Sequence, residues 1–211
     1  MEILALLWDI VVHLDKHLAV LLANYGLWIY AILFLIIFCE TGLVVLPFLP
    51  GDSLLFVAGA LAATGGMDIT ILCASLIAAA VIGNSVNYAV GRFLGPKVFQ
   101  WENSRFFNRN ALDKAHAFYE RHGGKMLVLT RFLPIIRTFA PFVAGIAKMP
   151  YGRFQAYNIA GGVFWVATLT LSGYWFGNLP GVKNNLSIVI SVIVAVSFLP
   201  ALIAYIRHRR A

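Results

Sequence analysis

Two stretches of sequence decide the fold: Glu40-Thr-Gly-Leu-Val-Val-Leu-Pro47-Phe-Leu-Pro50-Gly51-Asp52 and Arg131-Phe-Leu-Pro134-Ile-Ile-Arg137-Thr-Phe-Ala-Pro141-Phe-Val-Ala-Gly145. The first holds two carboxylates and the second two guanidiniums, all within strongly apolar sequence. A charge in hydrocarbon is costly, so it usually faces a partner or a wet cavity and marks function. Helix breakers free backbone groups that lipid cannot satisfy, so each broken stretch should line a cavity. The predicted breaks are Pro47, Pro50 and Gly51 in the first stretch, and Pro134, Pro141 and Gly145 in the second.

The composition of the chain is that of an integral membrane protein. Of its 211 residues, 61% are hydrophobic and only 12% are charged, against about half and about a quarter in soluble domains. The sequence therefore predicts an all-α polytopic protein with one membrane domain, 1–211. The net charge is +7, but its basic residues gather in loops, which favours membrane orientation over a nucleic-acid partner. Cys39 and Cys73 lie in apolar segments and imply no disulfide framework.

Hydrophobic runs divide the chain into spans, hairpins and surface segments. Four runs are long enough to cross a bilayer, whereas the two proline-broken stretches consist of short halves. We expect an interfacial helix at 1–17 and an amphipathic cytoplasmic segment at 91–125. The expected spans are 18–39, 69–90, 154–176 and 186–206, and the expected hairpins are 41–63 and 126–147.

The distribution of basic residues predicts how the broken stretches sit in the membrane. If both are re-entrant hairpins, four spans remain and both termini share one side with almost all the basic loop residues. Cytoplasmic loops are enriched in Lys and Arg, so that side is cytoplasmic. Full crossing by one or both stretches would move basic segments outside. On the predicted cytoplasmic side lie Lys16, Arg92, Lys97, Arg105, Arg109, Lys114, Arg121, Lys125, Lys148, Arg153, Arg207, Arg209 and Arg210, and only Lys183 lies opposite.

This topology gives the two halves of the chain opposite orientations. The first half, 18–90, has a hairpin that enters from outside, and the second, 126–176, has one that enters from inside. The spans that follow the hairpins place Asn84 and Asn158 beside small residues. Inverted repeats with broken helices that meet at mid-membrane are typical of transporters. We therefore predict two opposed re-entrant hairpins in an inverted repeat.

Several motifs in order resemble the bacterial DedA family, part of the superfamily with the SNARE-associated (VTT) domain. They are Glu40, Pro-Phe-Leu-Pro-Gly-Asp52, Gly-Arg92-Phe-Leu-Gly, Arg131-Phe-Leu-Pro-Ile-Ile-Arg137 and Pro-Phe-Val-Ala-Gly145. The resemblance implies a multi-pass protein of the bacterial inner membrane, with proton-dependent transport, envelope maintenance and flipping of undecaprenyl phosphate or phospholipid. The family's essential acidic pair falls on Glu40 and Asp52 and its arginine pair on Arg131 and Arg137. Relatives often carry an acid where this chain has Asn84, so the chain departs from the family pattern at that position.

Arg131 and Arg137 are the candidates for binding a substrate phosphate. A guanidinium stays charged and offers a planar fork of donors that suits phosphate oxygens. A continuous helix would place the two on different faces, and the Pro134 break can bring them together. A helix that starts near Thr138 would add backbone donors. The alternative is that both arginines only neutralise the two carboxylates.

Glu40 and Asp52 are the candidates for proton coupling. Burial favours the neutral carboxyl and a nearby arginine favours the charged one, so such a group can exchange a proton near neutral pH. Proton entry would then be linked to release of phosphate from the arginines. The sequence leaves alternatives open. Asp52 can simply cap the next helix after a turn, and Glu40 can snorkel to the outer interface.

Buried polar residues form a second set of candidates. Asn84, Asn87, Tyr88, Thr138 and Asn158 are expected to line a cavity. The first three and Asn158 can equally be polar contacts between helices, beside glycines that permit close packing.

The sequence therefore predicts a proton-coupled transporter or flippase of a phosphorylated lipid, with lipids and protons as partners. The scattered histidines show no metal-ligand spacing, and no nucleophile elbow or Walker loop is present, so we expect no metal, no cofactor and no enzyme activity. Other functions left open are a proton–cation antiporter, a lipid phosphatase and a non-transporting envelope assembly protein. A homo-oligomer is compatible with the sequence.

Overall fold

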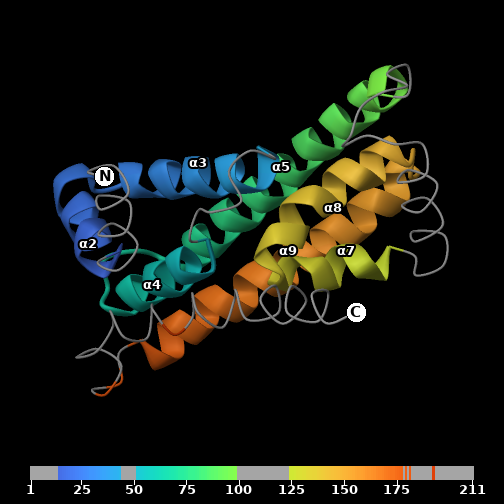
Figure 1. The fold of residues 1–211 in the computed structure, drawn as a ribbon. Helices are drawn as coiled ribbons and strands as arrows, with labels where there is room; N and C mark the ends of the chain where they lie inside the picture. Colours follow the sequence, from blue (N-terminus) through green and yellow to red (C-terminus); the bar gives the residue numbers. More distant parts are fainter. Residues whose placement is uncertain are drawn as a thin grey trace, which may run out of the picture. The chain divides into compact units, whose positions relative to one another are not determined.

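The computed structural model describes residues 14–43, 51–98 and 124–177, together with Leu179, Gly181 and Val192 (Figure 1). Within this part of the chain the elements are all helices, so the all-α prediction is confirmed there. Predictions for most of the interfacial helix, for Pro47 and Pro50, for the core of the cytoplasmic segment and for the last span with its basic tail lie outside the described residues.

The chain divides into two compact units, which we describe separately. Unit 1 contains residues 1–36, 49–76 and 165–211, and unit 2 contains residues 37–48 and 77–164. The two longest helices pass from one unit to the other: α5, Ile69–Val98, has 30 residues, and α9, Tyr151–Phe176, has 26. Both are long and apolar enough to cross a membrane, in agreement with the spans expected at 69–90 and 154–176.

In unit 1, the expected span 18–39 is not one helix. Helix α2, Leu14–Tyr25, ends at a turn, and helix α3 begins after it, Trp28–Gly42. Gly26 in this turn has φ +50°, a conformation that side chains other than that of glycine rarely adopt. The turn lets α2 fold back onto α4, Gly51–Ala63, and the side chain of Leu22 occupies the space beside Gly66, which lies just after α4. The prediction of a continuous span was wrong because Asn24-Tyr25-Gly26 is a helix end.

Helix α5 begins with a side-chain cap that the sequence analysis did not single out. The Oδ1 atom of Asp68 accepts hydrogen bonds from the backbone N–H groups of Thr70 and Ile71, at 2.8 and 3.0 Å. The free N–H groups of a first helical turn need such an acceptor. The N–H of Asp68 itself donates to the Tyr30 hydroxyl at 2.7 Å, which ties the cap to α3.

In unit 2, the second broken stretch forms three short elements. Helix α7, Lys125–Leu129, continues into a 3-10 turn, Thr130–Phe132, and helix α8, Pro134–Ile146, follows. Leu133 between them is extended, with φ −115° and ψ 100°, because a residue before proline avoids the helical region. Pro134 then occupies the first turn, where a missing N–H costs nothing. The predicted break at Pro134 is confirmed.

The other two breaks predicted in this stretch were wrong. Pro141 and Gly145 both lie inside α8, which continues through them to Ile146. Pro141 lacks an N–H, so it leaves the carbonyl of Arg137 without its helical donor. The helix therefore continues although one of its backbone hydrogen bonds cannot form.

The sequence Phe-Val-Ala-Gly occurs twice, as Phe56–Gly59 in α4 and as Phe142–Gly145 in α8. In unit 1, Gly59 packs against the backbone of Thr170 in α9, and Gly173 of α9 packs against the backbone of Phe56. A Cβ atom at either glycine would collide with a carbonyl oxygen.

Unit 2 repeats this arrangement with different partners. Gly145 of α8 packs against the backbone of Tyr88 in α5, and Gly91 of α5 packs against that of Phe142. Each Phe-Val-Ala-Gly helix therefore packs on the long helix that follows the other broken stretch in the sequence. The shared local pattern supports an internal repeat, whereas its inverted orientation stays a prediction.

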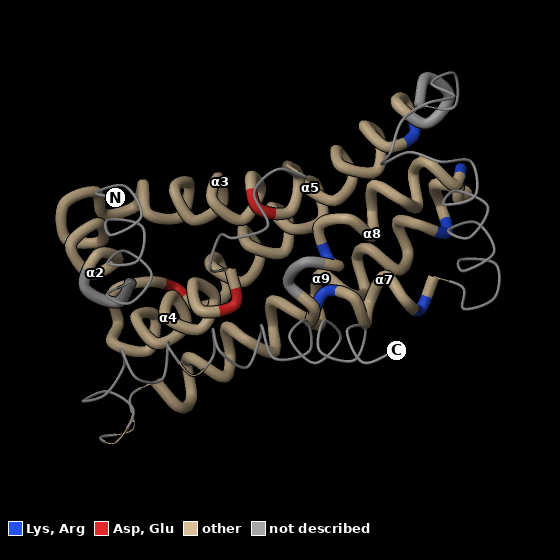
Figure 2. Tube along the Cα trace, in the orientation of Figure 1, with Lys and Arg blue, Asp and Glu red and all other residues tan. Residues whose placement is uncertain are grey.

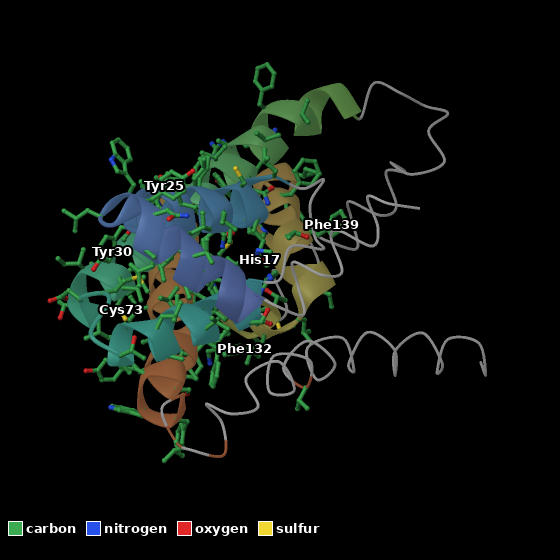
Figure 3. All side chains as sticks on the ribbon, turned by 90° about the vertical axis from the view of Figure 1, so that its left-hand side faces the viewer. His17, Tyr25, Tyr30, Cys73, Phe132 and Phe139 are labelled. Carbon is green, nitrogen blue, oxygen red and sulfur yellow. The ribbon has the colours of Figure 1, made fainter. Side chains whose placement is uncertain are left out.

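The outer surfaces of the described helices are apolar. Leu27, Trp28 and Phe93 are 84%, 72% and 67% exposed. Phe132 and Phe139, labelled in Figure 3, are also exposed. Lys, Arg, Asp and Glu mark only a few points along the helical trace (Figure 2). Large apolar patches on a surface mark contact with lipid or a partner.

Candidate functional site

Glu40 and Arg137 form a buried ion pair in unit 2. Arg137 donates from Nη2 to Oε1 of Glu40, and their side chains are 5% and 0% exposed. Glu40 lies near the end of α3, and Arg137 lies in the first turn of α8, where its N–H donates to the carbonyl of Leu133 at 2.9 Å. The helix break at Leu133 thus places the guanidinium on a carboxylate from a distant part of the sequence.

Close packing of α3 on α5 holds Glu40 in this position. A Cβ atom on Gly83 would lie 2.9 Å from the carbonyl oxygen of Phe38, and one on Gly42 would lie 3.3 Å from the Cα atom of Gly83, so the close approach depends on glycine at position 83. The same contact buries Thr41, whose hydroxyl donates to the carbonyl of Ile37 at 2.8 Å.

Asn87 joins the two backbone segments that carry the ion pair. Its Nδ2 atom donates to the carbonyls of Thr41, at 3.1 Å, and of Thr138, at 2.7 Å. These two residues directly follow Glu40 and Arg137. Asn87 is fully buried, and its Oδ1 atom has no hydrogen-bond partner among the described residues. The Asn87 side chain on α5 therefore holds the backbone next to both members of the pair, and its Oδ1 atom can still accept a hydrogen bond.

Arg131 is the second buried guanidinium of unit 2, and its surroundings differ from those of Arg137. It lies in the 3-10 turn, is 3% exposed, and donates from Nη2 to Oδ1 and to the carbonyl oxygen of Asn158, at 2.5 and 3.1 Å. Among the described residues no carboxylate pairs with it, and its Nε atom has no hydrogen-bond partner. Arg137 follows six residues later in the same unit. Two like charges thus share a region with one carboxylate.

Asn158 is the centre of a polar network between α5 and α9. Besides accepting from Arg131, its Oδ1 accepts from Nδ2 of Asn84 at 3.1 Å. Its own Nδ2 donates to the carbonyl of Val81 and to Gln155 Oε1, at 3.0 and 2.8 Å, and makes a longer contact with Ser85 Oγ at 3.3 Å. The network extends through Gln155, which donates to the hydroxyl of the exposed Tyr151 at 2.9 Å.

Tyr88 makes contacts typical of packing. Its hydroxyl donates to the carbonyl of Met149 at 2.5 Å and accepts from Arg92 at 2.9 Å. Its ring stacks on Phe154, with 4.3 Å between the ring centroids. Tyr88 therefore holds the turn between α8 and α9. This agrees with the alternative given above, in which Tyr88 makes polar contacts between helices.

Asp52 belongs to unit 1. It lies in the first turn of α4, where a carboxylate is stabilised by the helix dipole, and its Oδ1 accepts from Nε1 of Trp165 at 3.0 Å. Trp165 is almost fully buried. The two carboxylates that the sequence singled out therefore have different surroundings. Glu40 contacts an arginine, and Asp52 contacts an indole.

Sequence analysis missed three residues of these networks: Ser85, Gln155 and Trp165. A signal for one of them was present, because Tyr151, Gln155 and Asn158 recur at helical spacing and form a polar stripe in an otherwise apolar helix. Nothing in the sequence singled out Trp165 from the other tryptophans. In the described part of the chain, no group of three or more His, Cys, Asp or Glu residues is placed to hold a metal ion.

Comparison with known proteins identifies the family. The VTT domain matches residues 49–175, which include Asp52, Arg131 and Arg137. Protein DedA of Escherichia coli K12 is 54% identical over 213 aligned positions that cover all of this chain and 97% of that protein. The chain belongs to the DedA family.

Two further proteins show the range of relatives to which the chain is similar. An uncharacterized membrane protein of Mycobacterium leprae is 47% identical over 80% of this chain and 76% of its own length. Inner membrane protein YghB of E. coli is 37% identical over 87% of this chain and 82% of its own length. No solved structure matches the chain. As a DedA family member with a VTT domain, the chain is a membrane protein.

Proposed function

We propose that this chain transports or flips a phosphorylated lipid across the inner membrane, with proton coupling. A polyprenyl phosphate such as undecaprenyl phosphate, or a phospholipid, is the substrate. The observation that carries this proposal is Arg131, a buried guanidinium with neutral hydrogen-bond partners and a second guanidinium nearby. Burial of an uncompensated charge is costly. A phosphate group would supply the missing negative charge, and arginine is well suited to bind it.

Glu40 and Arg137 supply the proton-dependent step. While Glu40 is ionised, it holds Arg137 in the buried pair. Protonation of Glu40 weakens this pair, so Arg137 can join Arg131 in binding the phosphate. Loss of the proton restores the pair and favours release. This linkage is the reverse of the one expected from the sequence, where proton entry accompanied phosphate release, because the ionised Glu40 is what competes with phosphate for Arg137. Asp52 in unit 1 is the second proton-binding carboxylate, oriented by Trp165.

The membrane arrangement follows the distribution of charge. The proposed arrangement has four crossings, of which α3 alone makes the first, and two re-entrant hairpins, with both termini in the cytoplasm, as the positive-inside rule favours. The names of relatives such as YghB support an inner-membrane location. Transport of this kind supports envelope maintenance and is not an enzymatic reaction.

Purified protein in sealed vesicles tests this function. The vesicles contain a labelled polyprenyl phosphate, with the matching polyprenol as the uncharged control, and a pH gradient is imposed. We expect movement of the phosphate that depends on the gradient and is lost in Arg131→Ala and Arg137→Ala, while both variants still insert. Glu40→Gln should change its pH dependence. Normal flux in all three variants would exclude the mechanism, and release of inorganic phosphate would indicate a phosphatase.

A proton–cation antiporter is the second candidate. The open Oδ1 atom of Asn87 favours it, because a buried amide oxygen near a carboxylate is a suitable ligand for a hard cation. Sodium or potassium flux in the same vesicles without lipid movement would support it. Envelope function that survives neutralisation of Glu40, Asp52, Arg131 and Arg137 together would instead indicate an assembly role.

A further inference from the structure

We propose that Asn158 is a positioning residue that holds Arg131 through neutral groups and thereby keeps its positive charge available to a phosphate. The proposal deepens the proposed lipid-phosphate function and rests on it. It gives Asn158 a more specific role than lining a cavity. Because Asn158 is neutral, it holds Arg131 without cancelling the positive charge of the site.

The orientation of the Asn158 amide is fixed by its partners. Its Nδ2 atom faces the carbonyl of Val81 at 3.0 Å, and a carbonyl can only accept a hydrogen bond. A flipped amide would set two acceptors against each other there. Its Oδ1 atom must therefore face the guanidinium of Arg131 and the Nδ2 atom of Asn84.

The guanidinium of Arg131 is held in place, but no carboxylate among the described residues neutralises its charge. Two hydrogen bonds from its Nη2 atom end on neutral oxygens of Asn158. Its side chain lies against Gly161, where a Cβ atom would come within 3.0 Å of Nε and 3.1 Å of Cδ. The backbone of α9 therefore forms one side of the space that the Arg131 side chain occupies. The buried Nε atom still lacks a partner among the described residues, so a donor remains for a ligand.

A carboxylate at position 158 would change the charge and keep the size of the side chain. Arg137 shows the contrast within the same unit, because its guanidinium already donates to the carboxylate of Glu40. An Asp at 158 would convert Arg131 to the same paired state, and an anionic ligand would have to compete with it. A protonated Asp would again be a neutral acceptor.

Binding of a monoalkyl phosphate to the purified protein tests this inference without lipid transport. The probe is dodecyl phosphate in a neutral detergent, with dodecanol as the uncharged control, and binding is followed by thermal stabilisation at pH 7.5 and pH 5. The wild type at each pH corrects for ionisation of the probe. Arg131→Ala shows which part of the signal belongs to this site, and Thr170→Val, a buried polar change in unit 1, serves as the matched control.

We expect Asn158→Asp to weaken binding at least about tenfold at pH 7.5 and to recover most of it at pH 5. Asn158→Ser, which removes the acceptor without adding charge, should weaken binding by a smaller factor that is similar at both pH values. Thr170→Val should bind as the wild type does. Recovery in acid separates a charge effect from structural damage, which would not be reversed by pH. If Asn158→Asp does not fold, Asn158→Ser decides, because wild-type binding in that variant would overturn the positioning role.

The outcomes separate this inference from the proposed function. If the wild type transports lipid phosphate through Arg131 and Asn158→Asp behaves normally, the inference is wrong and the function stands. If the alkyl phosphate binds in the predicted pattern and no lipid is moved, the charge-setting role stands and the transport function is wrong. Absence of any Arg131-dependent binding of the probe in the wild type would overturn the inference.

Discussion

Arg137 donates to Glu40 across 97 positions of sequence, and both side chains are buried. This pair joins the end of α3 to the first turn of α8, and Asn87 holds the backbone on both sides. Arg131, close by, has neutral partners. The unequal state of the two arginines is the basis of the proposed exchange between proton and phosphate.

Removal of one partner of the buried pair should be more harmful than removal of both. Arg137→Met leaves the Glu40 carboxylate buried without its cation, and a loss of about 3–5 kcal/mol in stability is expected. Glu40→Gln combined with Arg137→Met should recover most of that loss. Thermal unfolding in detergent of both single variants and the double variant measures the coupling, and additive effects would argue against a strong pair.

The glycines at the crossings of α4 with α9 and of α8 with α5 should tolerate no side chain. Gly59→Val and Gly145→Val each place a side chain on a backbone carbonyl, so unfolding temperatures should fall sharply in both. Gly152→Val is the matched control, because a Cβ atom at this exposed position meets nothing within 4 Å. Equal effects at all three positions would show that helix propensity, and not close packing, is responsible.

Loss of the Asn87 amide should weaken the ion pair indirectly. Asn87→Leu removes two hydrogen bonds and leaves the buried carbonyls of Thr41 and Thr138 without them, at a cost of roughly 2–4 kcal/mol. The exposed Asn24→Leu should have little effect. In a cycle with Glu40→Gln, measured by thermal unfolding, the effects should be less than additive. Full additivity would mean that Asn87 does not act through the pair.

Trp165→Phe should remove the hydrogen bond to Asp52 and keep an aromatic ring in the core. The substitution removes the N–H that donates to the Asp52 carboxylate at 3.0 Å, so the unfolding temperature in detergent should fall and transport should weaken. Trp175→Phe is the control, because Trp175 is 66% exposed. Equal unfolding temperatures and equal transport in both variants would show that the indole of Trp165 does not hold Asp52 in place.

Much of this arrangement follows from sequence, and the exceptions have physical causes. Composition predicts helices in a membrane, and Pro134 predicts the break before Arg137, because proline constrains its own backbone and that of Leu133. Pro141 was expected to break the chain as well, yet α8 continues through it, since the packing of Gly145 on α5 holds the helix.

Pairing between distant segments is harder to predict. The repeated Phe-Val-Ala-Gly is visible in the sequence, but not that each copy packs on the helix after the other broken stretch. The charges of Glu40 and Asp52 look equivalent in sequence, whereas the structure gives one an arginine and the other Trp165. Which residues become partners depends on which faces of the helices pack together, and the composition of the chain does not contain that information.

Binding of phosphate at Arg131 is tested most directly by an experimental structure of the protein with a bound polyprenyl phosphate. We expect a phosphate oxygen about 2.7–2.9 Å from the Arg131 guanidinium, as in other charge-assisted hydrogen bonds, with Asn158 still in contact with Arg131. A phosphate bound elsewhere, with Arg131 still held only by Asn158, would contradict the mechanism.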